Sequence, residues 1–239
     1  HRFVGELAKP PCRNRTRADD EHPARIAVAY LMQLFGELPS VPFLEMIPLA
    51  EQRLIRQMVK QRVNTPLTSS CGRLFDAVAA IVGLRNHVTY EAQAAIELEA
   101  ISSRMTEENA GYPFTVKDGR VQLRSVLEAI VNEVEADVAA GVIGQRFHQT
   151  LAEIVRSVCL SIRESEGLNA VALSGGCWQN RLLLTATVRR LRAEGFTVYT
   201  HTQVPSNDGG ISLGQAAVAA ARLAQTESFS RRVQPAHRK

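Results

Sequence analysis

The sequence predicts a helix-rich α/β fold with a small mixed sheet. Through most of the 239 residues, apolar side chains recur at the i, i+3, i+4 spacing of amphipathic helices. An Asp-Gly pair at 118–119 joins two short strand-like runs, which is typical of a hairpin turn. From residue 170 onward, strand-like and helix-like segments alternate. This order implies a parallel strand pair joined by a crossover helix.

The first half of the chain reads as a series of helices. Residues 1–22 are polar and contain a Pro-Pro pair, so we expect an irregular N-terminal segment there. Two prolines at 37–44 and an Asn-Thr-Pro break at 64–66 interrupt the helical pattern. We expect helices over 23–36, 48–63, 72–82, 90–105, 124–140 and 144–165.

The remaining elements are the two hairpin strands and the alternating C-terminal series. We expect them over 114–116, 121–123, 170–174, 178–194, 196–200 and 210–224. The chain is long enough for one large domain, and we place that domain at 23–227. A basic tail at 228–239 follows it.

The basic isoelectric point of about 9.1 comes from the ends of the chain. Residues 1–17 carry five Lys or Arg against one Glu, and residues 228–239 carry four and no acid. Removing both ends from the totals of 28 basic and 24 acidic residues leaves 19 and 23, so the body is net acidic. A nucleic-acid-binding protein would carry a basic stripe on its body, so we expect no nucleic-acid partner.

The sequence also argues against a membrane protein. No apolar run approaches the roughly 20 residues that a membrane span needs, and no signal peptide is visible. We therefore expect no membrane partner and a cytoplasmic location, in which the cysteines are reduced thiols. The four cysteines are Cys12, Cys71, Cys159 and Cys177, and no two of them form a Cys-x-x-Cys pair. Cys159 is expected on the apolar face of a helix. Cys177 is either a thiol whose pKa is lowered by helix-end N–H groups or simply a small loop residue.

Two strand-to-helix junctions carry glycine pairs. Residues 174–180 read Ser-Gly-Gly-Cys-Trp-Gln-Asn, and residues 206–210 read Ser-Asn-Asp-Gly-Gly. Glycine lets the backbone approach a ligand closely, and free N–H groups at a helix N-terminus favour an anion. One such junction is often a plain turn. Two in one lobe predict a nucleotide or phosphate pocket.

The residues around these junctions resemble a known family. The segments TSSCGRLFDAVAAIVGL, TYEAQAAIELEA, SGGCWQNRLL and VPSNDGGISLGQA span residues 68–216 and are similar to the C-terminal part of the hydrogenase maturation carbamoyltransferases, the HypF family. The resemblance implies the second lobe of an actin-like (ASKHA) two-lobed ATPase fold, similar to the enzymes that make threonylcarbamoyladenosine on tRNA. Because the sequence begins with His1 rather than Met, we expect a piece of a longer protein without its first lobe.

The resemblance also implies a reaction. The family activates carbamoyl phosphate with ATP, forms carbamoyladenylate, and carbamoylates the C-terminal cysteine of HypE, a precursor step to the cyanide ligands of nickel-iron hydrogenase. The expected partners are therefore carbamoyl phosphate, a HypE-like acceptor and the rest of the HypF chain. Two enzymatic alternatives stay open, an O-carbamoyltransferase of a small metabolite and a tRNA-modifying relative. A third alternative is a non-catalytic nucleotide-binding interaction module.

Several residues are candidates for contact with the nucleotide. Gly72 and Asp76 are four residues apart and share one helix face, where a carboxylate suits either a ribose hydroxyl pair or the helix N-terminus. Asn180 can bond a ligand or cap its helix. In each case the resemblance favours the ligand, and it implies an adenylate held by Gly72, Asp76, the Gly175-Gly176 loop and Asn180.

Asp208 is the candidate metal ligand. A carboxylate on a glycine-flanked loop suits a divalent ion, but it also suits a helix N-cap. The resemblance implies iron or zinc shared with the first lobe, and it leaves the ligand ambiguous between Asn207 and Asp208. Ser69 and Ser70 can donate to a phosphate or cap a helix. The Thr-Tyr-Glu segment continues in the family with Gly, whereas this chain has Ala92, which puts a close ligand approach there in doubt.

Overall fold

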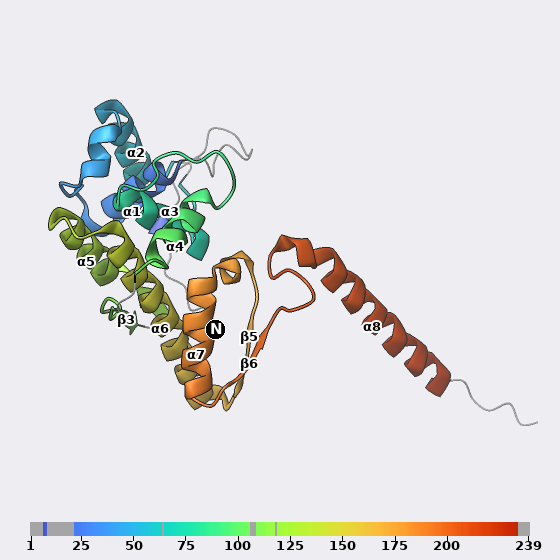
Figure 1. Ribbon diagram of the computed structural model, residues 1–239. Helices are drawn as coiled ribbons and strands as arrows, with labels where there is room; N and C mark the ends of the chain where they lie inside the picture. Colours follow the sequence, from blue (N-terminus) through green and yellow to red (C-terminus); the bar gives the residue numbers. More distant parts are fainter. Residues whose placement is uncertain (1–6, 9–21, 64, 106–108, 118, 234–239) are drawn as a thin grey trace, which may run out of the picture.

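Helices make up most of the computed structural model, and the strands are short (Figure 1). The structure describes residues 7–8, 22–63, 65–105, 109–117 and 119–233. Their strands form three separate two-stranded pairs. These are β1 (Leu7–Ala8) with β2 (Leu67–Thr68), β3 (Thr115–Lys117) with β4 (Arg120–Gln122), and β5 (Ala170–Leu173) with β6 (Thr197–Thr200).

The main core lies between helices from the first two thirds of the chain. Helix α1 (Pro23–Phe35) is buried along most of its length and packs on α3 (Cys71–Ile81). Pro23 at its first position and Gly36 after its last mark the ends of α1. The 3-10 helix η2 (Pro42–Met46) and α2 (Leu49–Gln61) pack outside α1. Because α2 buries Ile55 alone, most of its side chains face outward or are half-buried.

Three further helices complete this core. Helix α4 (Gln93–Ser102) packs against α3 and α6, and α5 (Arg124–Glu135) covers the other side. The β3–β4 hairpin precedes α5 and pairs Val116 with Val121. Helix α6 (Ala140–Glu166) is the longest, with 27 residues, and its first half is buried. Its second half leaves the core and reaches the C-terminal unit (Figure 1).

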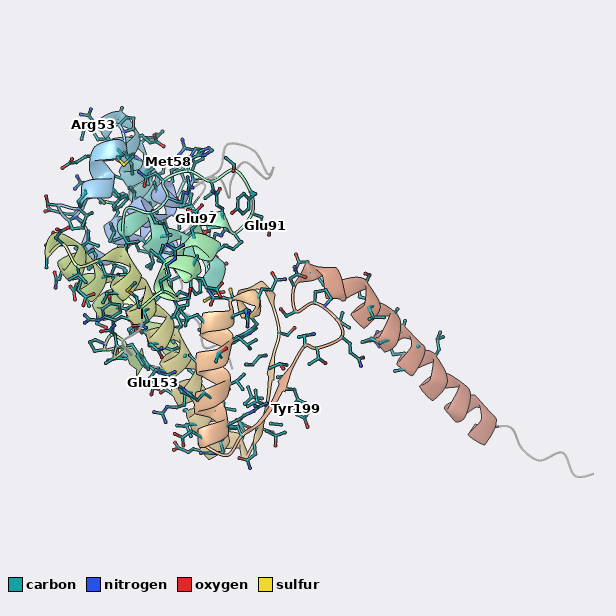
Figure 2. The ribbon with its side chains drawn as sticks, in the orientation of Figure 1. Arg53, Met58, Glu91, Glu97, Glu153 and Tyr199 are labelled. Carbon is teal, nitrogen blue, oxygen red and sulfur yellow. The ribbon has the colours of Figure 1, made fainter. Side chains whose placement is uncertain are left out.

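The C-terminal unit is the predicted parallel pair with its crossover helix. Strands β5 and β6 run parallel, and α7 (Arg181–Ala193) connects them and packs on α6. A second, smaller apolar cluster of Leu173, Leu191 and Phe196 fills the space between strands and helices, and Cys159 of α6 packs against it as predicted. The outer face of the pair is open. Tyr199, labelled in Figure 2, is 60% exposed on it.

Helix α8 (Ile211–Val233) projects away from the rest of the molecule (Figure 1). Every residue from 211 to 223 is exposed, including Ile211, Leu213, Val218 and Leu223. This helix therefore buries no side chain in that stretch, unlike α1 to α7.

The predicted fold class is confirmed, and the predicted helices and strands occur in the expected order. The structure adds η2 and the short strands β1 and β2, and its strands form three pairs where one small mixed sheet was expected. The other differences lie at element ends. Helix α4 begins at Gln93 because Ala92 takes a left-handed conformation with φ of 61°. Asp137 has φ of 56°, which ends α5 early, so α6 begins before the predicted position. The predicted helix 178–194 divides into a short 3-10 helix, η3 (Gly176–Gln179), and α7.

The predicted terminal segments lie only partly within the described residues. Strand β1 belongs to the segment 1–22, and most of that segment lies outside the described residues. Helix α8 continues into the predicted tail as far as Val233, and 234–239 lie outside. In the part of the chain that the structure describes, no helix is both long and apolar enough to cross a bilayer.

Candidate functional site

The two glycine junctions meet beyond the carboxyl ends of β5 and β6. The N–H group of Gly175 donates a hydrogen bond to the carbonyl of Ser206 at 2.7 Å. A Cβ placed on Gly176 would lie 4.0 Å from the Cβ of Asn207, so the second glycine of one loop faces the other loop. The sequence predicted one pocket from two separate loops, and their hydrogen bond makes them one structural unit.

Two glycines of this unit are required by its backbone. Gly175 has φ of 108°, a conformation that side chains rarely allow. Gly210 is the last residue of η4 (Asp208–Gly210), and a Cβ there would lie 2.8 Å from the carbonyl oxygen of Pro205. On the same edge the Nε2 atom of His201 lies 3.0 Å from the hydroxyl of Ser174. Both side chains belong to exposed residues that directly follow the strands. The edge thus presents polar groups to solvent.

Helix α3 brings the other predicted nucleotide residues to this unit. Its first turn packs on η3, which brings the backbone of Gly72 near the side chain of Cys177. Ser70 caps α3 by accepting a hydrogen bond from the N–H group of Arg73 at 3.3 Å. Of the two predicted roles of Ser70, phosphate donor or helix cap, the structure shows the helix cap.

Asp76 lies beneath this contact rather than at the surface. It is 3% exposed and forms an ion pair with Arg73, whose Nη2 atom lies 3.1 Å from the carboxylate. Its charge also acts on Cys177 and on Tyr30, which lie close to it in space. Burial raises the pKa of Tyr30. Asp76 therefore supports the first turn of α3 in this structure, and its contact with a ribose stays a prediction.

Asn180 joins the first glycine loop to the buried part of α6. Its Oδ1 atom caps α7 by accepting a hydrogen bond from the N–H group of Leu183 at 2.8 Å. Its Nδ2 atom lies 2.9 Å from Nε2 of His148, whose Nδ1 atom lies 2.6 Å from the carbonyl of Gly144. Since a carbonyl only accepts, Nδ1 carries the proton and Nε2 accepts from Asn180. Burial lowers the pKa of His148 to about 4, so the ring is neutral and holds the amide in place.

The N-terminus of α7 is already occupied by a carboxylate of the protein. The Oε1 atom of Glu99, on α4, accepts hydrogen bonds from the N–H groups of Arg181 at 2.7 Å and Leu182 at 3.2 Å. With Asn180 on the next N–H group, the first three donors of the helix are satisfied. The expectation that this helix end offers free N–H groups to an anion is therefore wrong. Backbone donors for a ligand must come from the glycine loop itself.

Asn207, and not Asp208, caps the helical turn of the second loop. The Oδ1 atom of Asn207 accepts from the N–H group of Gly209 at 3.2 Å, which corrects the capping alternative for Asp208. Asp208 is exposed at the first position of η4. Among the described residues no group of three or more His, Cys, Asp and Glu side chains could hold a metal ion. Asp208 can supply one hard oxygen ligand to a site completed elsewhere.

The structure adds three residues that the sequence did not single out for the site: Arg73, Glu99 and His148. Arg73 lies in the motif with Gly72, so its position could have suggested a partner for Asp76. Glu99 and His148 belong to other helices, and no local pattern indicates their contacts.

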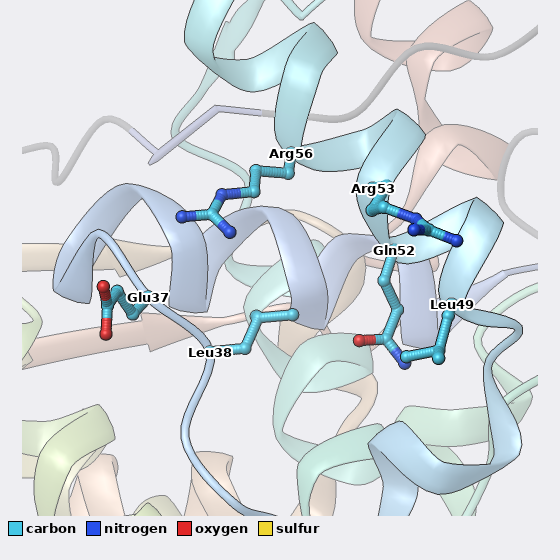
Figure 3. Close-up of a pocket in the computed structure, with 6 residues that line it drawn as sticks. All are labelled: Glu37, Leu38, Leu49, Gln52, Arg53 and Arg56. Atoms are coloured by element: carbon cyan, nitrogen blue, oxygen red, sulfur yellow. The ribbon is translucent and has the colours of Figure 1, made fainter.

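A pocket of about 450 Å³ lies elsewhere, between α2 and the segment that follows α1 (Figure 3). It is lined by Glu37, Leu38, Leu49, Gln52, Arg53 and Arg56. None of these residues belongs to the glycine loops or to α3. The two arginines make it a competing place for an anion, which experiments on the loops must take into account.

Comparison with known proteins identifies the family. Residues 15–215 match the family model described as "Carbamoyltransferase, Kae1-like Domain, second subdomain". The chain belongs to this family. Within it, the chain is 41% identical over 160 residues to carbamoyltransferase HypF of Synechocystis, covering 65% of this chain and 20% of that protein. It is 32% identical to carbamoyltransferase HypF2 of Cupriavidus necator, covering 92% of this chain and 30% of that protein.

Solved structures of the family agree with the fold. A crystal structure of full-length HypF "in the phosphate- and nucleotide-bound form" matches with a TM-score of 0.80 and 31% identity, over 92% of this chain and 29% of that one. The structure of T. kodakarensis HypF matches with a TM-score of 0.74 at 20% identity and shows the shared fold. The chain spans less than a third of the length of these relatives. It corresponds to one subdomain of a larger family architecture.

Proposed function

We propose that this chain is the nucleotide-holding second subdomain of a carbamoyltransferase. The observation that carries the proposal is the hydrogen bond between Gly175 and Ser206, which fixes the two glycine loops against each other. Glycine-lined backbone at the carboxyl edge of parallel strands is where α/β proteins place phosphate groups. The loop pair and the start of α3 converge there, because Gly72 contacts Cys177 within the first loop.

The proposal assigns a part to each residue. Gly72, Gly175 and Gly176 let the backbone approach the adenylate closely. Asn180 is held rigidly by His148 and by its capping bond, so the loop that it ends is fixed before a ligand arrives. Asp76 is proposed as a ribose contact that depends on movement of its Arg73 partner. Support also comes from the solved relative, whose title describes a phosphate- and nucleotide-bound form.

The whole reaction is proposed from the family. Carbamoyl phosphate supplies the carbamoyl group and loses its phosphate, and reaction with ATP gives carbamoyladenylate with release of pyrophosphate. The cysteine thiol at the C-terminus of a HypE-like acceptor then takes the carbamoyl group, and AMP leaves. In this scheme the subdomain works by orientation and charge stabilisation, which together supply most of the rate enhancement in such transfers. The remaining HypF segments would supply the other wall of the site.

We propose Asp208 as one ligand of a divalent ion, iron or zinc, shared with the first subdomain. The ion would supply positive charge to substrate oxygen atoms. A cytoplasmic location and the absence of nucleic-acid partners also belong to the proposal, and the acidic body of the chain supports the latter.

Nucleotide contact is tested on the chain itself by magnetic resonance of its backbone amides during titration with ATP. We expect the largest shifts at Gly72, Gly175 and Gly176, with little change at the hairpin Gly119. Shifts confined to the neighbourhood of Arg53 and Arg56 would instead assign ATP to the pocket on α2 and refute the proposal.

A pair of variants sharpens this test. Gly176→Leu places bulk in the loop without a backbone conflict, since its Cβ meets only ordinary contact. Gly214→Leu is the matched control, because nothing lies within 4 Å of a Cβ at that position in α8. The first variant should weaken the ATP-dependent shifts and the second should leave them unchanged.

Catalysis is tested by pyrophosphate release from ATP. The chain alone should be inactive, because the expected phosphate- and metal-binding segments of the first subdomain are absent from its sequence. Together with that subdomain, release should require carbamoyl phosphate. Carbamoyl-phosphate-dependent release by the chain alone would contradict the two-subdomain proposal.

A further inference from the structure

Two cysteines from distant parts of the sequence meet between the nucleotide segments. Cys71 is the first residue of α3 and precedes Gly72, whereas Cys177 lies in η3 directly after Gly176. Their thiols influence each other where the first turn of α3 contacts η3. Both residues are half-buried, and both are free thiols rather than a disulfide. The contact therefore bridges α3 and the first glycine loop.

We propose that Cys71 and Cys177 are an oxidation site that forms a reversible disulfide on reaction with a hydroperoxide. Disulfides in reducing compartments are typically transient and redox-sensing, and they require two thiols already in reach of each other. The contact between α3 and η3 supplies that proximity.

The environment makes the two thiols chemically unequal. The thiol of Cys71 lowers the pKa of Cys177 to about 7, and the backbone of Gly72 and the charge of Arg73 act in the same direction. Burial and the charge of Asp76 oppose this effect without cancelling it. The same thiol contact, together with burial, raises the pKa of Cys71 well above its ordinary value. Cys177 is therefore the nucleophile near neutral pH, and Cys71 keeps its proton.

The reaction then proceeds in two balanced steps. The Cys177 thiolate attacks one peroxide oxygen, the O–O bond breaks, and the leaving alkoxide takes a proton to become an alcohol. Cys177 is now a sulfenic acid. The sulfur of Cys71 attacks the sulfur of Cys177, the S–O bond breaks, and the hydroxide takes the Cys71 proton and leaves as water. Two thiols and one hydroperoxide thus give one disulfide, one alcohol and one water, with two electrons passing to the peroxide.

The disulfide would shorten the contact between the two segments. A disulfide holds its sulfur atoms about 2.05 Å apart, which is closer than two thiols without a covalent bond can come. Because Gly72 and Gly176 adjoin the two cysteines, the bond draws the start of α3 towards the glycine loop. The inference that the disulfide closes the nucleotide site rests on the proposed function. The inference that the two thiols are oxidised to a disulfide is independent of it.

Peptide mapping tests the disulfide directly. The full chain is prepared with Cys12→Ser, treated with tert-butyl hydroperoxide at neutral pH, and its remaining thiols are blocked with N-ethylmaleimide. We expect a cross-linked peptide pair that contains Cys71 and Cys177 and is cleaved by dithiothreitol. Cys159 serves as the internal control, because burial raises its pKa and it packs in an apolar cluster. Oxidation of Cys159 at the same rate, or a Cys177 sulfinic acid without any cross-link, overturns the proposal.

Alkylation rates test whether Cys71 activates Cys177. In Cys71→Ala the Cys177 pKa should return towards about 8.5. At neutral pH the native thiol then holds about fifteenfold more thiolate than the variant, partly offset by its lower nucleophilicity. We expect iodoacetamide to modify Cys177 roughly threefold faster in the native chain than in Cys71→Ala. Equal rates, with both proteins folded by thermal unfolding, refute the activation by Cys71.

ATP titration of the reduced and oxidised chains separates the two proposals. Binding by the reduced chain that is lost on oxidation and restored by dithiothreitol supports closure of the site. Equal ATP affinity of the reduced and oxidised chains overturns the inference that the disulfide closes the nucleotide site. The formation of the disulfide is still decided by the cross-linked peptide. No binding by the reduced chain, even at millimolar ATP, counts against the proposed function alone.

Discussion

Acid should destabilise the folded chain through His148, and His148→Gln should remove that effect. The imidazole is fully buried, at 0% exposure, and neutral, since Nδ1 donates to Gly144 and Nε2 accepts from Asn180. Burial lowers its pKa from the ordinary 6.5 to about 4. Between these values the unfolded chain binds a proton that the folded chain does not. Stability is therefore complete above pH 6.5 and is lost as the pH falls towards 4.

The size of the effect follows from the two pKa values. Each pH unit between them costs about 1.4 kcal/mol, so the loss at pH 4 is about 3 kcal/mol, a large share of the stability of a typical domain. Carboxylates also titrate near the acid end of this range. The difference between the native chain and the variant at each pH isolates the contribution of His148.

Urea unfolding at a series of pH values measures the effect. His148→Gln replaces the ring by an amide that does not titrate, so its free energy of unfolding should approach that of the native chain as the pH falls. His87→Gln is the matched control for the loss of one imidazole, because His87 is exposed. A constant difference between the native chain and His148→Gln from pH 7.5 to 4 would refute the neutral, buried assignment.

Three further predictions concern individual residues. Asp76→Asn should weaken ATP binding by roughly 1–3 kcal/mol if the carboxylate bonds the nucleotide, as measured by calorimetry on the protein with both subdomains. Unchanged affinity with a lowered melting temperature would leave Asp76 with a structural role only. Asp208→Asn should reduce metal content in that protein, whereas Asp208→Ala should change stability by less than about 0.5 kcal/mol because the cap is another residue. Metal retained at full stoichiometry in both variants excludes Asp208 as a ligand. Ala92→Gly should stabilise the chain by up to about 1 kcal/mol, since Ala pays for its left-handed conformation. The control Ala100→Gly, in regular helix, should destabilise it by roughly 0.5–1 kcal/mol, and a loss of stability in both variants would contradict the reasoning.

Much of the fold was predictable because its signals are local. Pro23 and Gly36 bound α1 by their own backbone preferences, and the Asp-Gly pair in the sequence predicted the hairpin in which Lys117 pairs with Arg120. The encounter of the two glycine loops was also predictable, because parallel strands bring their carboxyl ends to one edge. These inferences need only the residues that form each element.

The contacts that complete the site were not predictable from such signals. Glu99 reaches the start of α7 from a helix 82 residues earlier in the sequence, and nothing near either residue indicates that contact. His148 lies 32 residues from Asn180, and its tautomer is set by a third residue. Ala92 gives a related lesson. Its left-handed backbone, with φ of 61°, suits glycine better than alanine, and the helical pattern around it did not indicate this conformation.

The exposed helix α8 begins directly at the second glycine loop. Its 23 residues give it a length of about 35 Å, and its inner end is the Asp208–Gly210 turn. A rotation of about 10° at that turn moves the far end by about 6 Å, given this length. The same turn follows Asn207, which faces Gly176, and lies beside Ser206, which accepts from Gly175. The direction in which α8 leaves the molecule is therefore set at the same loop that bonds Gly175, so a small change in that loop would be largest at the far end of the helix.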